Sequence, residues 1–191
     1  MPDQQSYLYI TLSQTGSLLS SILKVVTGAR YNHVSISFSP DLVRMYSFGR
    51  IHPYNPFWGG FVVESPRAGT YLRFPKTSAL VLAVAVSEES KQKMRGRLRA
   101  MLQEQGSYHY DLLGLVFAGL HIRFRRQRCY YCSEFVRELL LTSRVEGAEG
   151  LAPIVRPIDF LGMPGRRIVY QGRLNEYYPV PQPVWEGKIA N

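Results

Sequence analysis

The sequence predicts an α+β fold in a single domain that spans residues 1–191, and three observations support this. Strand-like segments fill the first half of the chain, helix-like segments follow, and one more strand comes near the end, an order typical of the α+β class. A chain of 191 residues is long enough to bury one substantial core. The 46% apolar and 19% charged residues are ordinary for a globular protein. We see no internal repeat and no linker, so the proline-rich tail from about residue 179 is assigned to the same domain.

The first elements are short and alternate with turns. Residues Tyr7–Leu12 are predicted as a strand, and a short helix follows over Leu18–Val26. Residues His33–Phe38 alternate between polar and apolar side chains, the period-two pattern of a strand with two different faces. The turn residues Pro40-Asp41 then separate this strand from a partner over Leu42–Phe48.

The middle of the chain contains a loop, two strands and a long helix. Residues 49–60 (GRIHPYNPFWGG) are rich in Gly, Pro and Asn and are predicted as a loop. A strand resumes over Phe61–Glu64, and the continuous apolar run at 79–86 is typical of a strand that is buried on both faces. Residues Glu88–Gln105 are predicted as an amphipathic helix, because apolar residues recur there at i, i+4, i+7 and i+8.

Two helices and a strand complete the prediction. A short apolar helix is expected over Leu112–Leu120, and a second helix over Ser133–Leu141 has an apolar stripe that includes Phe135 and Leu139. A final strand is expected over Arg167–Tyr170.

The chain is basic. Lysine and arginine number 23 against 14 aspartates and glutamates, which gives a net charge of +9 and a pI near 9.7. This balance favours anionic partners, but no helix-turn-helix, zinc-finger or RNP-type pattern is present, so no nucleic acid is expected. A run of arginines next to the second cysteine is interpreted either as an edge that binds an anionic ligand or as a solvated charged loop. Its members are Arg123, Arg125, Arg126 and Arg128.

Targeting signals are not recognised in the sequence. The first residues lack the basic region of a signal peptide, and no apolar run approaches the roughly 18–20 residues that span a bilayer. The expected location is therefore cytoplasmic, without a transmembrane segment.

Both cysteines lie in the stretch CYYCSEFV, at Cys129 and Cys132. Cys132 directly precedes the helix predicted over Ser133–Leu141, where the helix dipole and unpaired backbone N–H groups favour a thiolate and can stabilise an oxyanion. A thiolate nucleophile also needs a base, and the base needs a group that orients it.

Four histidines are candidates for the base: His33, His52, His109 and His121. His33 is preferred because it lies on the polar face of a regular strand, which holds an imidazole rigidly. Glu64 ends the next predicted strand but one, so strand pairing is expected to bring it beside His33.

Other interpretations of the cysteines remain open at this point. Cys132 by itself is more typical of a buried structural thiol than of a nucleophile. A thioredoxin-type pair is disfavoured because here the second cysteine, and not the first, starts the helix. A zinc site lacks a second close pair of ligands. No role is assigned to Cys129.

Four segments in this order carry a family resemblance: YNHVSISF, FVVES, YHYDLLGLVFAGL and YYCSEFVRELL. Together they resemble the circularly permuted, NlpC-type branch of the papain-like cysteine amidases and peptidases, with YiiX-like proteins nearest and lecithin:retinol acyltransferases more distant. In that branch the histidine strand precedes the cysteine helix, as it does here. The resemblance covers roughly Tyr7 to Tyr177 and includes RPIDF and RIVYQGRL near the end. It implies a small antiparallel, barrel-like sheet packed against the cysteine-bearing helix.

The resemblance also implies roles for individual residues. Cys132 corresponds to the nucleophile, His33 to the general base and Glu64 to the group that orients the histidine. The neighbouring residues Tyr31, Tyr131 and Ser133 are expected to contact the substrate. No metal and no organic cofactor are expected.

Two functions are therefore compared. The first is a cysteine-dependent hydrolase or acyltransferase that cleaves an amide or ester of a small-molecule, peptide or lipid-like acyl substrate through an acyl-enzyme. The second is a basic binding module for nucleic acid or anionic lipid in which the triad is vestigial. The first is preferred, because the positions of Cys132 and His33 match a catalytic order.

Overall fold

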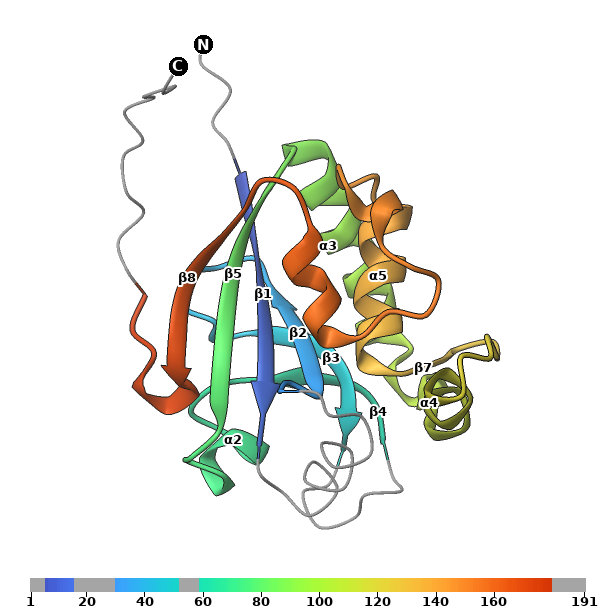
Figure 1. Ribbon diagram of the computed structural model, residues 1–191, viewed down its shortest axis with the longest axis horizontal. Coiled ribbons are helices and arrows are strands. Elements are labelled where there is room, and N and C mark those ends of the chain that lie inside the picture. The colour runs from blue at the N-terminus through green and yellow to red at the C-terminus, as the bar shows by residue number, and fades with distance from the viewer. Residues whose placement is uncertain (1–5, 16–29, 52–58, 180–191) are drawn as a thin grey trace.

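Eight strands form one sheet in the computed structural model of this protein, which describes residues 6–15, 30–51 and 59–179 (Figure 1). The strands are β1 (Ser6–Gln14), β2 (His33–Ser37), β3 (Met45–Arg50), β4 (Gly59–Glu64), β5 (Ser78–Val86), β6 (His109–Tyr110), β7 (Cys129–Tyr130) and β8 (Arg166–Arg173). The α-helices are α2 (Gly69–Arg73), α3 (Glu88–Gln103), α4 (Leu112–Gly119) and α5 (Cys132–Thr142). Short 3₁₀ turns are η1 (Gln105–Ser107), η2 (Ala148–Gly150), η3 (Pro157–Gly162) and η4 (Leu174–Glu176). The predicted α+β class is confirmed.

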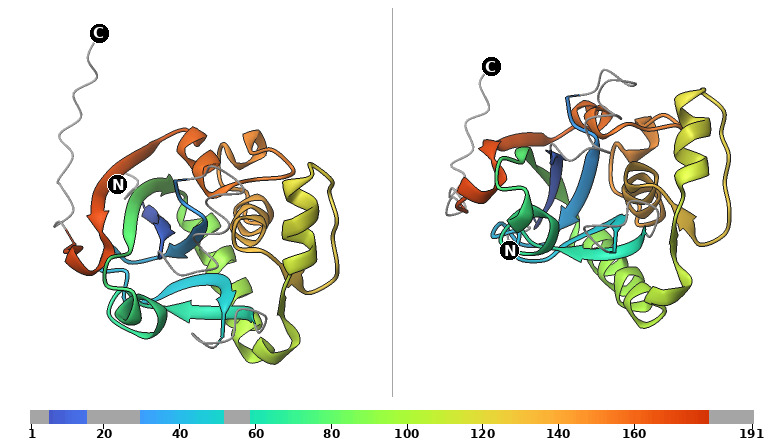
Figure 2. Two further views of the ribbon diagram at one scale, coloured as in Figure 1. Left: turned by 60° about the horizontal axis from the view of Figure 1, so that its bottom comes forward. Right: turned by 90° about the horizontal axis from the view of Figure 1, so that it is seen from below.

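The sheet has the order β7-β6-β4-β3-β2-β1-β5-β8. All neighbouring strands are antiparallel except β6 and β7, which run parallel. The longest pairing joins β1 to β5 over nine residue pairs, from Ser6–Val86 to Gln14–Ser78. The strands curl strongly around one another, as Figure 2 shows. The sheet therefore has an outer and an inner face, and the central strands β1, β2 and β5 are largely buried on both.

Two apolar cores result from this curvature. The outer face of β1, with Leu8 and Ile10, packs against α3 and α5 in the larger core. The inner face carries Tyr9 and Val81 into a second cluster, which Tyr71 of α2 closes. This arrangement explains why the run at 79–86 is apolar throughout: alternate residues of β5 enter different cores.

Most predicted elements are present with small changes at their ends. The strand expected over Leu42–Phe48 begins only at Met45, because Leu42 has a positive φ of 56° and the Asp41 carboxylate accepts a hydrogen bond from the Val43 N–H at 3.0 Å. The helix expected to reach Gln105 ends at Gln103. The helix expected over Leu18–Val26 lies outside the described residues.

Several short elements were not predicted. Helix α2 has five residues, and β6 and β7 have two residues each, which is too short for a periodic pattern in the sequence. Across the described parts of the chain, no helix has the length and apolar character required to cross a bilayer.

Candidate active site

Helix α5 places Cys132 at the end of the sheet where β2 begins. The helix starts at Cys132 itself, one residue earlier than predicted, and its N-cap residue Tyr131 is extended and offers no side-chain hydrogen bond. The first backbone N–H groups of α5 are therefore not capped by the Tyr131 side chain. Phe135, Val136 and Leu139 anchor the helix in the larger core, and Cys132 is 3% exposed.

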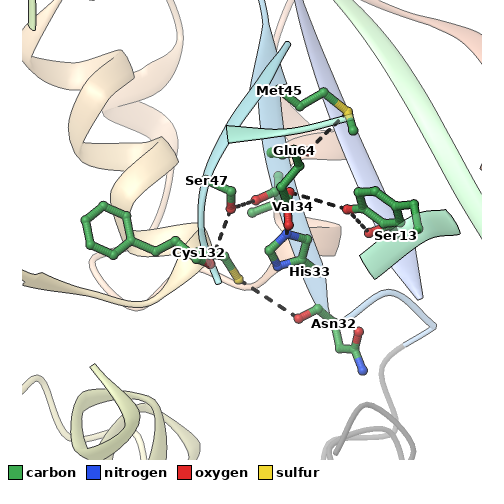
Figure 3. Close-up of polar contacts among 11 residues, drawn as sticks. Ser13, Asn32, His33, Val34, Met45, Ser47, Glu64 and Cys132 are labelled. Atoms are coloured by element: carbon green, nitrogen blue, oxygen red, sulfur yellow. Dashed lines mark hydrogen bonds and ion pairs between the residues drawn. The ribbon is translucent and has the colours of Figure 1, made fainter. Parts of the chain in front are cut away.

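His33 and Glu64 form a close pair on the inner face of the sheet (Figure 3). The His33 Nε2 atom lies 3.0 Å from Glu64 Oε2 and 3.2 Å from Glu64 Oε1. Both side chains are largely buried, with 17% and 15% of their surface exposed. Glu64 thus occupies Nε2, and the other ring nitrogen of His33 is left for the thiol of Cys132.

Strand β3 lies between β2 and β4, and a glycine in β3 leaves room for the contact between the His33 and Glu64 side chains. Glu64 is paired with Met45 of β3, so the carboxylate must reach over β3 to contact His33 of β2. At the crossing point β3 carries Gly49. A Cβ atom there would lie 3.4 Å from His33 Cε1 and 3.5 Å from Glu64 Oε1, so any larger side chain would enter the space between imidazole and carboxylate.

The environment of His33 favours the imidazolium. Burial alone lowers its pKa, but the charge of Glu64, followed by hydrogen bonding to Cys132 and Glu64, outweighs burial and raises the pKa of His33 to about 10. Cys132 also lies near the preceding residue, with its Sγ 4.0 Å from the Asn32 carbonyl oxygen. Figure 3 shows the Cys132 sulfur beside His33 and Asn32. The three residues predicted as a triad are therefore brought together.

Tyr71 of α2 extends this network, and sequence reasoning missed it. Its hydroxyl donates to Glu64 Oε2 at 3.4 Å and shares a hydrogen bond with Ser13 Oγ at 3.1 Å. Burial first, then the charge of Glu64, raises the pKa of Tyr71 well above its ordinary value, so this hydroxyl stays protonated. No periodic signal marks α2, so only the tertiary structure identifies Tyr71 as a positioning residue for Glu64.

Replacing Tyr71 with phenylalanine is expected to lower the rate of Cys132 alkylation by iodoacetamide about three- to ten-fold and to shift its pH profile, because Glu64 loses a donor that holds its carboxylate toward His33. The rate is measured by peptide mass spectrometry. Tyr178→Phe is the control, since that side chain is 70% exposed. A Tyr71→Phe protein with lower thermal stability but an unchanged pH profile would reduce Tyr71 to a packing role.

The three residues predicted to contact substrate are buried. Tyr31 is 2% exposed, Tyr131 is 4% exposed and Ser133 is 2% exposed. The Ser133 hydroxyl donates to the Val155 carbonyl at 2.7 Å, so it ties α5 to the segment that follows. These residues shape the surroundings of Cys132, and their contact with a substrate stays a prediction.

The arginine run has partners within the protein. Arg125 pairs with Glu134 at 3.3 Å and with Glu138 at 3.2 Å. Arg126 contacts the fully buried Asp111 at 2.6 Å, and Arg128 contacts Glu104 at 2.9 Å. Three of the four arginines are thus neutralised by carboxylates, which removes most of the free charge on which an anion site at Arg123, Arg125, Arg126 and Arg128 would depend.

The other cysteine and two of the other histidines are not members of this cluster. Cys129 is a free, half-buried thiol at the start of β7. His109 and His121 are exposed, and His52 lies outside the described residues. Among the residues that the structure describes, no group of three or more His, Cys, Asp or Glu side chains is arranged to hold a metal ion.

No protein-family model matches the chain, and no curated protein or solved structure is significantly similar to it. The class of protein is therefore defined by fold and geometry alone: an α+β domain with a largely buried Cys–His–Glu cluster at the start of a helix. The resemblance of the sequence motifs to permuted papain-like enzymes remains a prediction.

Proposed function

We propose that this protein is a cysteine-dependent hydrolase or acyltransferase that cleaves an amide or ester bond through an acyl-enzyme intermediate. One observation carries the proposal. The His33 imidazole is held by the Glu64 carboxylate on one side and faces the Cys132 thiol at the start of α5 on the other. A nucleophile, a base and an orienting group in this arrangement meet the geometric requirement for nucleophilic catalysis.

Acylation begins with attack of the Cys132 thiolate on the carbonyl carbon of the substrate. The proposal assigns stabilisation of the oxygen that becomes negatively charged to backbone N–H groups in the first turn of α5, which begins at Cys132. His33 is protonated at neutral pH because its pKa is raised to about 10. It gives this proton to the leaving nitrogen or oxygen as the C–N or C–O bond breaks.

Deacylation uses the same histidine as a base. Once the sulfur is part of a thioester it carries no negative charge, so one of the interactions that raise the pKa of His33 is lost. His33 then takes a proton from water or from another acceptor, which attacks the thioester carbonyl and releases Cys132. Glu64 holds the ring orientation in both steps. Whether water or another acceptor enters distinguishes a hydrolase from an acyltransferase.

The fold that belongs with this proposal is the circularly permuted papain-like one. The histidine strand β2 precedes the cysteine helix α5 in the chain, and α5 packs against the outer face of a curved, mainly antiparallel sheet. Both features support the permuted arrangement. A basic binding module ranks second, because the net charge of +9 favours it but three arginines of the run beside Cys132 are paired.

The proposal predicts that Cys132 reacts rapidly with iodoacetamide at pH values below 7, and that His33→Ala removes this reactivity. The physical reason is that an imidazolium beside the sulfur stabilises the thiolate. Trypsin releases both cysteines in one peptide, Cys129–Arg137 (CYYCSEFVR), so fragment ions report both thiols in the same sample. Cys129 serves as an internal control and is expected to react slowly below pH 7.

A different result would remove the basis of the proposal. If Cys132 reacted only as pH approached the ordinary thiol value of about 8.5, equally in wild type and in His33→Ala, the cysteine would not be activated by His33. Circular dichroism of both proteins ensures that a loss of reactivity is not a loss of fold.

A further inference from the structure

A groove with a volume of about 470 Å³ lies between the connection from β2 to β3 and the second half of α3. Its apolar lining includes Phe38, Tyr46 and Leu102. This volume is in the range of pockets that hold small ligands. His33 and Phe38 are five residues apart along β2 and its extension, roughly 16 Å at the rise of a strand, so the groove lies at the opposite end of β2 from the candidate active site.

Three arginines surround the groove. Arg44 comes from the connection between β2 and β3, and Arg95 and Arg99 lie one helical turn apart on α3. The Arg95 guanidinium lies 5.2 Å from the centre of the Phe38 ring, which holds it over the apolar lining. Each of the three residues is exposed.

Within the described parts of the chain, none of these three arginines forms an ion pair with a carboxylate. Asp41 also lines the groove, where its Oδ1 accepts the Val43 N–H in a turn, so three guanidinium groups share the lining with one carboxylate and the formal charge of the lining is +2. The contrast with the arginine run beside Cys132 is clear, because there Arg125, Arg126 and Arg128 are paired. The three arginines outnumber the single carboxylate of the lining, and an anion that enters the groove reduces the repulsion between the guanidinium groups.

We propose that this groove binds a ligand in which a phosphate monoester is joined to a short apolar group. A phosphate monoester carries a charge of about −1.5 to −2 at pH 7 and has several acceptor oxygens, which suits guanidinium donors from separate side chains. Phe38, Tyr46 and Leu102 provide contacts for the apolar part. The site is separate from Cys132 and serves binding whatever reaction the protein performs.

Isothermal titration with hexyl phosphate tests the site directly. Wild-type protein is expected to bind one molecule, with inorganic phosphate at least ten-fold weaker because it lacks the apolar part. Arg44→Gln, Arg95→Gln and Arg99→Gln are each expected to weaken binding at least five-fold. Arg97→Gln is the matched control: it lies on the same helix but points to Thr142 of α5, 2.7 Å away, and is expected to stay within two-fold of wild type.

A second experiment distinguishes a lipid headgroup from a soluble ester as the origin of the phosphate. Phosphatidylcholine vesicles with and without phosphatidic acid are tested in a flotation assay. Arginine-dependent binding to the acidic vesicles assigns the ligand to a lipid headgroup, and binding of hexyl phosphate alone assigns it to a soluble ester. Binding by the wild-type protein is also expected to weaken with added salt, and this measurement does not depend on the folding of any variant. The proposal is overturned if hexyl phosphate and acidic vesicles both fail to bind, or if all three variants bind like wild type.

Discussion

Replacing Cys132 by alanine is expected to reduce hydrolysis of an activated ester such as p-nitrophenyl hexanoate to the uncatalysed background, a loss of about 10⁴-fold or more in kcat. The reason is that the proposed reaction passes through a thioester at this sulfur, and no other side chain of the cluster can form it. The fold is expected to persist, because Cys132 is small and the variant removes one sulfur atom from the edge of the larger core. Initial rates and thermal unfolding measure both effects.

The chain offers a matched control for this experiment. Cys129 is also a free thiol, three residues earlier and half-buried, but nothing places it beside His33. Cys129→Ala is therefore expected to keep the full rate, and intact-mass measurement of wild type mixed with ester is expected to show one acyl group on Cys132. A Cys132→Ala protein that hydrolyses the ester as fast as wild type would refute the cysteine mechanism.

Replacing Glu64 by glutamine is expected to have the second-largest effect, because it removes the main interaction that raises the pKa of His33. In wild type this pKa is about 10, against an ordinary value of 6.5. With the carboxylate gone, burial dominates and the pKa falls. His33 is then largely neutral at pH 8, and ester hydrolysis at that pH is expected to drop about 10- to 100-fold.

The same change alters how stability depends on pH. A histidine whose folded-state pKa is raised stabilises the fold fully below pH 6.5, and this contribution is lost as the pH rises toward 10. In a Cys132→Ala background, which removes the titration of that thiol, the free energy of unfolding is therefore expected to fall by about 1–2 kcal/mol between pH 7.5 and 9. When Glu64→Gln is added to this background, the decrease is expected to disappear.

The window from pH 7.5 to 9 avoids the other shifted groups. Burial raises the pKa of Glu134 to about 7, and its contribution to stability is lost between its ordinary value of 4.5 and that pH. Burial also keeps the pKa values of Tyr71 and Tyr110 well above 10. Urea unfolding at several pH values measures the slope, with Glu89→Gln as control, since Glu89 is a solvent-exposed partner of Lys93. An unchanged slope in Glu64→Gln would show that the pair does not hold a proton.

Sequence patterns were sufficient for the elements that hold the cluster. Period-two alternation marked the strand of His33, and the apolar stripe with Phe135 and Leu139 marked the helix that begins at Cys132. The expectation that Glu64, two strands further on, would lie beside His33 is met by the 3.0 Å contact between their side chains. These features depend on local periodicity and on strand order, which a single sequence contains.

The rest depends on contacts between residues that are far apart in the chain. Tyr71 reaches Glu64 from a five-residue helix without a sequence signal, and Gly49 matters only because β3 passes between His33 and Glu64. Whether an arginine is paired with a carboxylate also depends on such distant contacts. The run at 123–128 was interpreted either as an anion-binding edge or as a solvated charged loop, and it is largely paired. Arg44, from the connection between β2 and β3, instead meets Arg95 and Arg99 of α3 at one groove.

The sequence by itself determined the fold class, the identity of the cysteine and histidine that face each other, and the order in which their elements occur. Only the tertiary structure decided which charges are neutralised, because an ion pair depends on distances of a few ångströms between side chains and not on residue type. It also decided the protonation state of His33, since burial and the Glu64 carboxylate act on its pKa in opposite directions and their balance is set by packing.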